Sequence, residues 1–276
     1  MCSLKLEENQ EEKEMKQEAN YGNWVPEKAL CMLFGMTALF LIIAFVLGFT
    51  VENPIITAIF GVICAVTAAM AIYMYVCHEK FAFGKGNMMA GVHQNLVEHL
   101  EWNGEGRLLD IGCGAAALTV RCAKAFPKAK ITAMDYWGAE WSYAKEQCER
   151  NARIEGIADR VTFQKGDAAK LDFADGTFDA AVSNFVFHEV RTAKDKREVV
   201  REALRVVKKG GVFSFQDMFS QKALYGDMNE FVEILKSEGI SEIHYIGNLE
   251  KKLDFIPGFV TTPWMISGMG IIYGRK

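Results

Sequence analysis

The sequence lacks several features that mark common protein classes. Its seven cysteines are scattered, odd in number and not arranged in metal-binding pairs. The formal charge of −4 gives no basic surface for nucleic acid. Residues 1–20, rich in Glu, Lys and Gln, lack the apolar core and cleavage site of a secretory signal. We therefore expect reduced thiols, no nucleic-acid partner and a protein that faces the cytosol.

Charge is absent from two long stretches near the N-terminus. No charged residue occurs from Ala29 to Val51 or from Pro54 to Cys77. Each run exceeds the roughly 20 residues that a helix needs to cross the bilayer core, and neither has a polar face at helical spacing. Only Glu52-Asn53 separates the runs, so we expect a transmembrane helical hairpin over residues 29–77.

The charges outside this hairpin predict its orientation. Lys28, Lys80 and Lys85 flank its outer ends, whereas the turn has no Lys or Arg. The positive-inside rule therefore places both termini in the cytoplasm. We expect a polar N-terminal tail over residues 1–28 and a cytoplasmic catalytic domain over residues 78–276, anchored at the cell membrane by two transmembrane helices.

Small residues recur along the second apolar run. Gly61, Ala65 and Ala69 are four residues apart and form a face that permits close contact between helices. This face either packs the hairpin on itself or joins two subunits in a homodimer, and the sequence leaves both open.

A glycine turn organises the remainder of the chain. An apolar run from Arg107 to Ile111 precedes Gly112-Cys113-Gly114, and a helix-forming stretch from Ala115 to Phe126 follows. Strand, glycine turn and helix open a nucleotide-binding α/β domain. Glycine permits positive φ and close approach of a ligand, and the helix N-terminus offers N–H donors. The spacing G-x-G-x-x-A also fits dinucleotide binding, so the turn alone leaves the ligand open.

Strand and helix patterns alternate beyond this turn. We expect strands over 130–135, 161–165, 178–183, 212–216, 243–246 and 270–273, and helices over 88–100, 138–155, 195–207 and 223–237. This order predicts an α/β fold with a Rossmann-like, doubly wound, mostly parallel seven-stranded sheet. Ligands of such sheets bind at the carboxyl ends of the strands.

The glycine turn also resembles the first motif of class I S-adenosylmethionine (SAM) methyltransferases, D/E-x-G-x-G-x-G. Asp110 supplies the acidic residue, which the dinucleotide motif does not require, and Ala116 stands in place of the third glycine. Three later segments match the same family in order: 163–168, 173–179 and 208–211. From about Met88 to the C-terminus, the chain therefore resembles a class I SAM-dependent methyltransferase.

This resemblance implies SAM as the cofactor and a set of binding residues at the strand ends. These are Asp110, Gly112, Cys113 and Gly114 for the methionine part, Asp135 for the ribose with Tyr136 beside the adenine, Asp167 and Ala168 for the adenine edge, and Asn184 for the amino group.

His188 is the candidate catalytic residue. SAM carries an activated methyl group, so transfer needs mainly positioning, but an acceptor hydroxyl would still need a base. His188 follows the fourth strand and has a suitable unperturbed pKa, and the alternative is a structural or helix-capping role. Asp217, after the fifth strand, is a weaker candidate, and we expect no metal.

Apolar side chains near the last strands predict the acceptor class. They are Met218, Phe219, Tyr225, Phe255, Phe259, Trp264 and Met265. We expect core packing for most of them, but an apolar lining beside a membrane hairpin favours a small lipophilic acceptor, such as a quinone, lipid, thiol or phenol. Two alternatives remain: an NAD(P)-dependent oxidoreductase, for which we find no hydride-transfer residues, and a non-catalytic SAM-binding membrane scaffold.

Overall fold

The structure, a computed structural model, describes residues 18–51, 54–83, 88–138 and 145–276. The chain divides into two compact units. One comprises residues 23–90, and the other joins the segment up to Gly22 to residues 91–276. The expected domain boundary at residues 77–78 stays a prediction.

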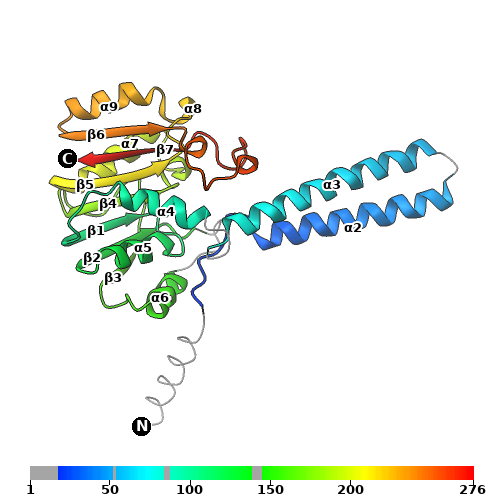
Figure 1. Cartoon of the computed structure of the whole chain (residues 1–276), viewed down its shortest axis with the longest axis horizontal. Helices are drawn as coiled ribbons and strands as arrows, with labels where there is room; N and C mark the ends of the chain where they lie inside the picture. The colour runs from blue at the N-terminus through cyan, green and yellow to red at the C-terminus, as the bar shows by residue number, and fades with distance from the viewer. Residues whose placement is uncertain (1–17, 52–53, 84–87, 139–144) are drawn as a thin grey trace, which may run out of the picture. The chain divides into compact units, whose positions relative to one another are not determined.

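The larger unit contains a seven-stranded sheet with strand order β3-β2-β1-β4-β5-β7-β6 (Figure 1). The strands are β1 (Gly106–Ile111), β2 (Ala129–Asp135), β3 (Val161–Lys165), β4 (Phe178–Asn184), β5 (Val207–Asp217), β6 (Glu242–Gly247) and β7 (Gly270–Arg275). Strands β1 to β5 pair in parallel, whereas β7 is antiparallel to both β5 and β6. The predicted Rossmann-like, mostly parallel sheet is confirmed, and the antiparallel strand β7 makes the sheet mixed.

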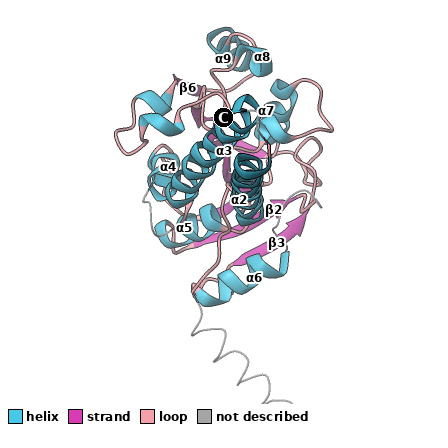
Figure 2. Cartoon of the chain, turned by 90° about the vertical axis from the view of Figure 1, so that its right-hand side faces the viewer, coloured by secondary structure: helices cyan, strands magenta, loops and turns pink. Residues whose placement is uncertain are grey.

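Helices cover both faces of this sheet (Figure 2). They are α4 (Met88–Glu98), α5 (Ala117–Ala125), α6 (Lys145–Ile154), α7 (Lys196–Arg205), α8 (Lys222–Tyr225) and α9 (Met228–Ser237), with short 3₁₀ turns η1 (Phe187–Glu189), η2 (Leu249–Lys251) and η3 (Gly258–Val260). Alternate strand residues enter opposite cores because successive side chains point to opposite faces. Leu108 packs in the core with α4 and α5, whereas Leu109 packs in the core with α7 and α9.

Among the expected elements whose limits differ in the structure, two have a clear local cause. The single helix expected over 223–237 is broken into α8 and α9, because Gly226 has φ +66° and Asp227 caps α9 by accepting from Asn229 N (3.0 Å). Strand β5 begins at Val207 rather than at Val212. Its pairing with β4 is irregular there, which accommodates the Gly210-Gly211 segment inside the strand.

The smaller unit contains α2 (Glu27–Thr50) and α3 (Pro54–Phe81), both long and apolar enough to cross a membrane. The two helices lie antiparallel and side by side (Figure 1). At their outer ends, Asn23 Nδ2 donates to the His78 carbonyl (2.8 Å) and Trp24 stacks on Phe81 with centroids 5.3 Å apart. Gly84 and Gly86, for which the sequence leaves hinges and a plain interdomain linker equally open, lie outside the described residues.

The small-residue face of α3 is exposed in the single chain. Gly61, Ala65 and Ala69 are all exposed, and an added Cβ on Gly61 would meet no atom within 4 Å. The seam with α2 instead includes Cys64, whose thiol lies 3.7 Å from the Thr37 carbonyl. Packing of the hairpin on itself therefore does not use the small-residue face.

The chain before the hairpin is held by α6. The Asn151 side chain is fully buried, accepts from Asn20 N (3.0 Å) and donates to the carbonyls of Asn20 (2.7 Å) and Ala115 (2.9 Å). Tyr21 donates to Glu155 (2.6 Å). One amide thus joins the end of the polar tail to the glycine turn.

We expect Asn151→Ala to loosen the glycine turn. The substitution removes the Asn151 donor of the buried Ala115 carbonyl and the acceptor of Asn20 N, which should lower local stability by about 2 kcal/mol. Amide hydrogen exchange of residues 112–118, measured on the full chain in detergent, should then be about 30-fold faster. Gln147→Ala is the control, because Gln147 also donates to the Asn20 carbonyl (2.6 Å) but does not contact the turn. Equal exchange in both variants would contradict the bridging role.

Candidate active site

The carboxyl ends of the parallel strands meet at one edge of the sheet. Ile111 aligns with Met134 and Ser183, Asp135 aligns with Lys165, and Asn184 aligns with Gln216. The cofactor-binding residues predicted from β1, β2 and β4 therefore occupy one edge, and Asp167 lies two residues beyond β3.

The glycine turn is fastened to the end of β2. The N–H groups of Gly112 and Cys113 both donate to the Met134 carbonyl (2.8 and 3.0 Å), and Gly114 N donates to Asp135 Oδ2 (2.8 Å). Gly112 has φ +76°, and a Cβ there would lie 2.2 Å from Val186 Cγ2. Glycine is therefore required at this position by both backbone conformation and space.

Helix α6 holds the same turn from the other side. The Cys148 thiol lies 3.0 Å from the Gly114 carbonyl, and Trp137 Nε1 donates to that carbonyl (3.2 Å). Burial raises the pKa of Cys113, so this thiol is not a ready nucleophile.

Asp110 is a deeply buried carboxylate at this edge, and only one of its two oxygens has a hydrogen-bond partner among the described residues. It is 1% exposed, and its Oδ2 accepts from Thr119 Oγ1 (2.5 Å). Its Oδ1 is buried without a hydrogen-bond partner among the described residues. Burial raises the pKa of Asp110 to about 7, with the Thr119 hydroxyl opposing the rise and Asp135 adding to it. A buried carboxylate with an unused oxygen suits a cationic ligand group such as an ammonium.

Asp135 and Tyr136 occupy the end of β2 as predicted. Asp135 Oδ1 accepts from Trp137 N (2.9 Å), while Oδ2 accepts from Gly114 N (2.8 Å). A carboxylate offers about four acceptor sites, so both oxygens retain capacity for ribose hydroxyls. Tyr136 is 60% exposed, with Lys165 Nζ 5.6 Å from its ring centroid.

Asp167 and Asn184 are each fixed by a residue that the sequence analysis did not single out. Asp167 Oδ1 accepts from Ala169 N (2.9 Å) and from Thr192 Oγ1 (3.0 Å), beside the buried Ala168. Asn184 Oδ1 accepts from Gln216 Nε2 (2.8 Å).

His188 forms a close pair with Asp217. Its Nδ1 lies 2.7 Å from Asp217 Oδ1, and its Nε2 lies 3.3 Å from Glu189 Oε1. Asp217 is fully buried and also accepts from the N–H groups of Phe187 (2.7 Å) and Met218 (2.6 Å). Burial alone would lower the pKa of His188, but the Asp217 and Glu189 carboxylates outweigh it and raise that pKa. The pair has the arrangement of a histidine base oriented by a carboxylate.

The predicted apolar lining divides into buried and exposed members. Phe219 and Tyr225 are buried in the core, whereas Phe255, Phe259 and Trp264 are 38%, 40% and 67% exposed on the segment between β6 and β7. Core packing therefore accounts for the first pair, whereas the other three rings expose part of their apolar surface.

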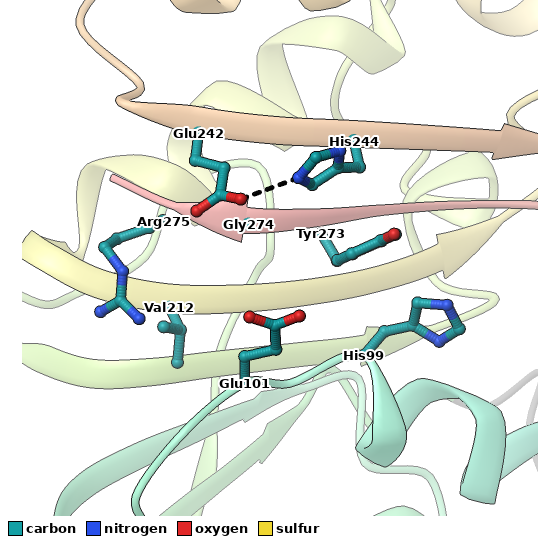
Figure 3. Close-up of a pocket in the computed structure, with 8 residues that line it drawn as sticks. All are labelled: His99, Glu101, Val212, Glu242, His244, Tyr273, Gly274 and Arg275. Atoms are coloured by element: carbon teal, nitrogen blue, oxygen red, sulfur yellow. Dashed lines mark hydrogen bonds and ion pairs between the residues drawn. The ribbon is translucent and has the colours of Figure 1, made fainter.

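A small surface hollow lies away from this edge (Figure 3). The rings of His99 and His244 both pack near the Tyr273 ring, with centroids 4.5 and 5.1 Å from its centroid. His244 pairs with Glu242 (2.9 Å). Val212, which also lines the hollow, stands five residues before Asp217 on β5, so the hollow is not part of the candidate site. No group of His, Cys, Asp or Glu suited to a metal ion occurs among the described residues.

Residues 109–215 match the family model described as "Methyltransferase domain". This segment is a methyltransferase domain. It spans β1 to β5 and thus contains the glycine turn, Asp135, Asp167 and His188. Three predictions are confirmed at the level of this domain: the resemblance to class I SAM-dependent methyltransferases, the enzyme class and the cofactor.

Three known proteins are similar to the chain over parts of its length. A sterol 24-C-methyltransferase of Aspergillus fumigatus is 30% identical over 139 residues, which cover 50% of this chain and 35% of that protein. Geranyl diphosphate C-methyltransferase of Streptomyces coelicolor A3(2) has a TM-score of 0.53 at 16% identity, covering 72% of this chain and 83% of that one. The [4+2]-cyclase SpnF has a TM-score of 0.52 at 20% identity, covering 70% and 83%.

These likenesses have different weight. The chain spans only about a third of the sterol methyltransferase, so that protein's activity does not transfer to this one as a whole. The structural likenesses show the fold alone, since a cyclase shares it with a methyltransferase. The residues of this chain are therefore the basis for assigning its methyl acceptor and its membrane anchor.

Proposed function

We propose that this protein is a membrane-anchored SAM-dependent methyltransferase that modifies a small lipophilic acceptor. The observation that carries the proposal is the buried Asp110 carboxylate, which has one oxygen without a hydrogen-bond partner in the described part of the chain and directly precedes the glycine turn held by Asp135. These two carboxylates and the turn fit the cationic and hydroxyl groups of SAM.

Each predicted binding residue has a physical task in this proposal. SAM, when bound, supplies an activated methyl group on a cationic sulfur. Asp110 and the backbone of Gly112, Cys113 and Gly114 hold the methionine part, and Asp135 accepts from the ribose hydroxyls. Tyr136, Asp167 and Ala168 surround the adenine, and Asn184 orients the amino group. The site then acts chiefly by holding the reacting groups in line.

His188 serves as the base toward the acceptor. Asp217 holds Nδ1 and thereby directs Nε2 toward the acceptor proton. Because Glu189 contacts Nε2 in the structure, its exposed side chain must turn aside when the acceptor binds.

Two observations favour a lipophilic acceptor. Phe255, Phe259 and Trp264 expose aromatic surface between β6 and β7. The similar sterol 24-C-methyltransferase acts, by its name, on a sterol, which has a large hydrocarbon part. Both observations agree with an acceptor drawn from the bilayer.

The hairpin supports the proposed location. Helices α2 and α3 expose large apolar side chains along their length, among them Phe45, Phe49, Val62 and Val66. Such surfaces are stable in lipid and unfavourable in water. We infer that the hairpin anchors the protein in the cell membrane with both termini in the cytoplasm, and that the Gly61, Ala65 and Ala69 face joins two copies.

The oxidoreductase and scaffold alternatives are weaker. The matched family model is that of a methyltransferase domain, and the His188–Asp217 pair gives the edge an acid–base group that a scaffold would not need.

We expect Asp135→Ala to abolish SAM binding while the fold persists. The change removes the acceptor for ribose and also releases Gly114 N, so affinity should fall by at least about 100-fold. Isothermal titration of the full chain in detergent, with SAM and with NAD(P)H, measures this. Asp179→Ala is the control, because Asp179 likewise accepts a backbone N–H, from Arg107 (2.8 Å), near the opposite ends of the strands. Unchanged affinity in Asp135→Ala, or preference for NAD(P)H, would refute the assigned pocket.

His188→Ala should lower turnover by about 10²- to 10⁴-fold and leave SAM affinity unchanged. The assay uses labelled SAM with a membrane extract as acceptor source, and mass spectrometry identifies the product. A base must be neutral to act, so the rate should rise with pH through the raised pKa of His188. Asp217→Asn removes the carboxylate that raises this pKa, so the rise should move to lower pH. Full activity of His188→Ala would remove it as the base, and absence of any product would favour the scaffold.

The anchor is tested on expressed full-length protein. It should stay with membranes after washing at high pH and salt, because helices held by hydrocarbon do not depend on ion pairs. Light scattering of the detergent-extracted protein should report a dimer, and Gly61→Leu should reduce it to a monomer. Release into the wash would overturn the anchor, and a wild-type monomer would overturn the dimer.

A further inference from the structure

Three side-chain amides form a continuous chain beneath the carboxyl edge of the sheet. Asn95 Nδ2 of α4 donates to Gln216 Oε1 of β5 (3.1 Å), and Gln216 Nε2 donates to Asn184 Oδ1 of β4 (2.8 Å). Gln216 is 1% exposed and Asn95 8% exposed. Both residues lie outside the segments on which the resemblance rests: the glycine turn and residues 163–168, 173–179 and 208–211.

The direction of this chain is set by the backbone. Gln216 Nε2 also lies 3.5 Å from the Val92 carbonyl, at the long end of the hydrogen-bond range. A carbonyl can only accept, so the amide nitrogen of Gln216 must face it. The oxygen of Gln216 then faces Asn95, which must present its nitrogen. The remaining hydrogen of Gln216 points to Asn184, whose oxygen must accept it.

We propose that Gln216 is a positioning residue that fixes the rotamer and polarity of the Asn184 side chain for the cofactor, and that Asn95 fixes Gln216 in turn. This rests on the proposed function, because Asn184 is a proposed contact of the SAM amino group. A free carboxamide exchanges its oxygen and nitrogen by rotation at little cost, whereas a buried chain of amides allows one arrangement. Asn184 Oδ1 accepts one hydrogen from Gln216 and keeps a second lone pair, which can accept from the ammonium of SAM. The cofactor then meets an oxygen already oriented, which reduces the entropy lost on binding.

The test compares three variants of the full chain in detergent. Gln216→Met keeps the size of the side chain but cannot donate to Asn184, and SAM affinity should fall by about tenfold. Asn95→Leu leaves the Gln216–Asn184 bond but releases Gln216, and affinity should fall by about threefold. Titration with both SAM and S-adenosylhomocysteine should show the same losses, because the lost orientation concerns the amino group, which both ligands carry.

Ser214→Ala is the matched control. Ser214 lies two residues before Gln216 on β5, is fully buried and donates to the Leu96 carbonyl of α4 (2.8 Å). It therefore links the same strand to the same helix without reaching Asn184. Its loss should lower thermal stability about as much as Asn95→Leu does, while SAM affinity stays within about twofold of wild type. A purely structural role for the amide chain would make the control and the variants alike in affinity.

The outcomes separate this proposal from the proposed function. If wild type does not bind SAM, the proposed function fails and this inference falls with it. If wild type binds SAM and both Gln216→Met and Asn95→Leu bind equally well, only the positioning role is overturned. Should Gln216→Met fail to fold, Asn95→Leu alone decides. Asn95 is the terminal member of the series of three amides, and α4 keeps its hydrogen bond from Ser214 in this variant.

Discussion

The Asp135 carboxylate is the interaction on which the site depends. It accepts from Gly114 N and Trp137 N, so it holds the glycine turn after β1 against the end of β2. Two segments that supply proposed SAM contacts are thereby fixed to each other. Because each oxygen retains acceptor capacity, the same group can organise the protein and contact the cofactor.

Strand β5 supplies the second half of the organisation. Gln216 and Asp217 are adjacent, so their side chains point to opposite faces of the sheet. Gln216 reaches Asn184 on the side of α4, whereas Asp217 reaches His188 of the η1 turn. One strand end therefore orients a proposed cofactor contact with one residue and the proposed base with the next. Both are buried, which strengthens their electrostatic influence on the partner.

Local sequence patterns predicted the strand ends well, because each depends on neighbours in the chain. Asp110 before Gly112, and Asp135 after an apolar run, can be placed from spacing alone. The residues that fix them could not be found in this way. Gln216 meets Asn95 across 121 positions, and Asn151 meets Asn20 across 131. Polar residues inside expected helices and strands, such as Asn151 and Gln216, were the available signal, but only the fold reveals their partners.

The same reasoning explains the break between α8 and α9. The apolar spacing of residues 223–237 continues through Gly226 as if one helix were present. The positive φ of Gly226 and the capping carboxylate of Asp227 end one helix and start another, so local backbone chemistry overrides the periodic pattern. The irregular start of β5 has a similar origin in Gly210-Gly211.

Backbone strain is concentrated where the ligand is expected. Among the described residues, four that are not glycine have positive φ: Ala116, Trp137, Phe185 and Asn248. The first three follow β1, β2 and β4 at the carboxyl edge. A left-handed conformation costs about 1–2 kcal/mol for a residue with a side chain, and such outliers persist where surrounding contacts impose them. Here the imposing contacts are identifiable: Ala116 N donates to the Cys113 carbonyl, Trp137 N to Asp135, and Phe185 N to the Gln216 carbonyl. The hydrogen bonds that shape this edge therefore also hold its three left-handed residues in place.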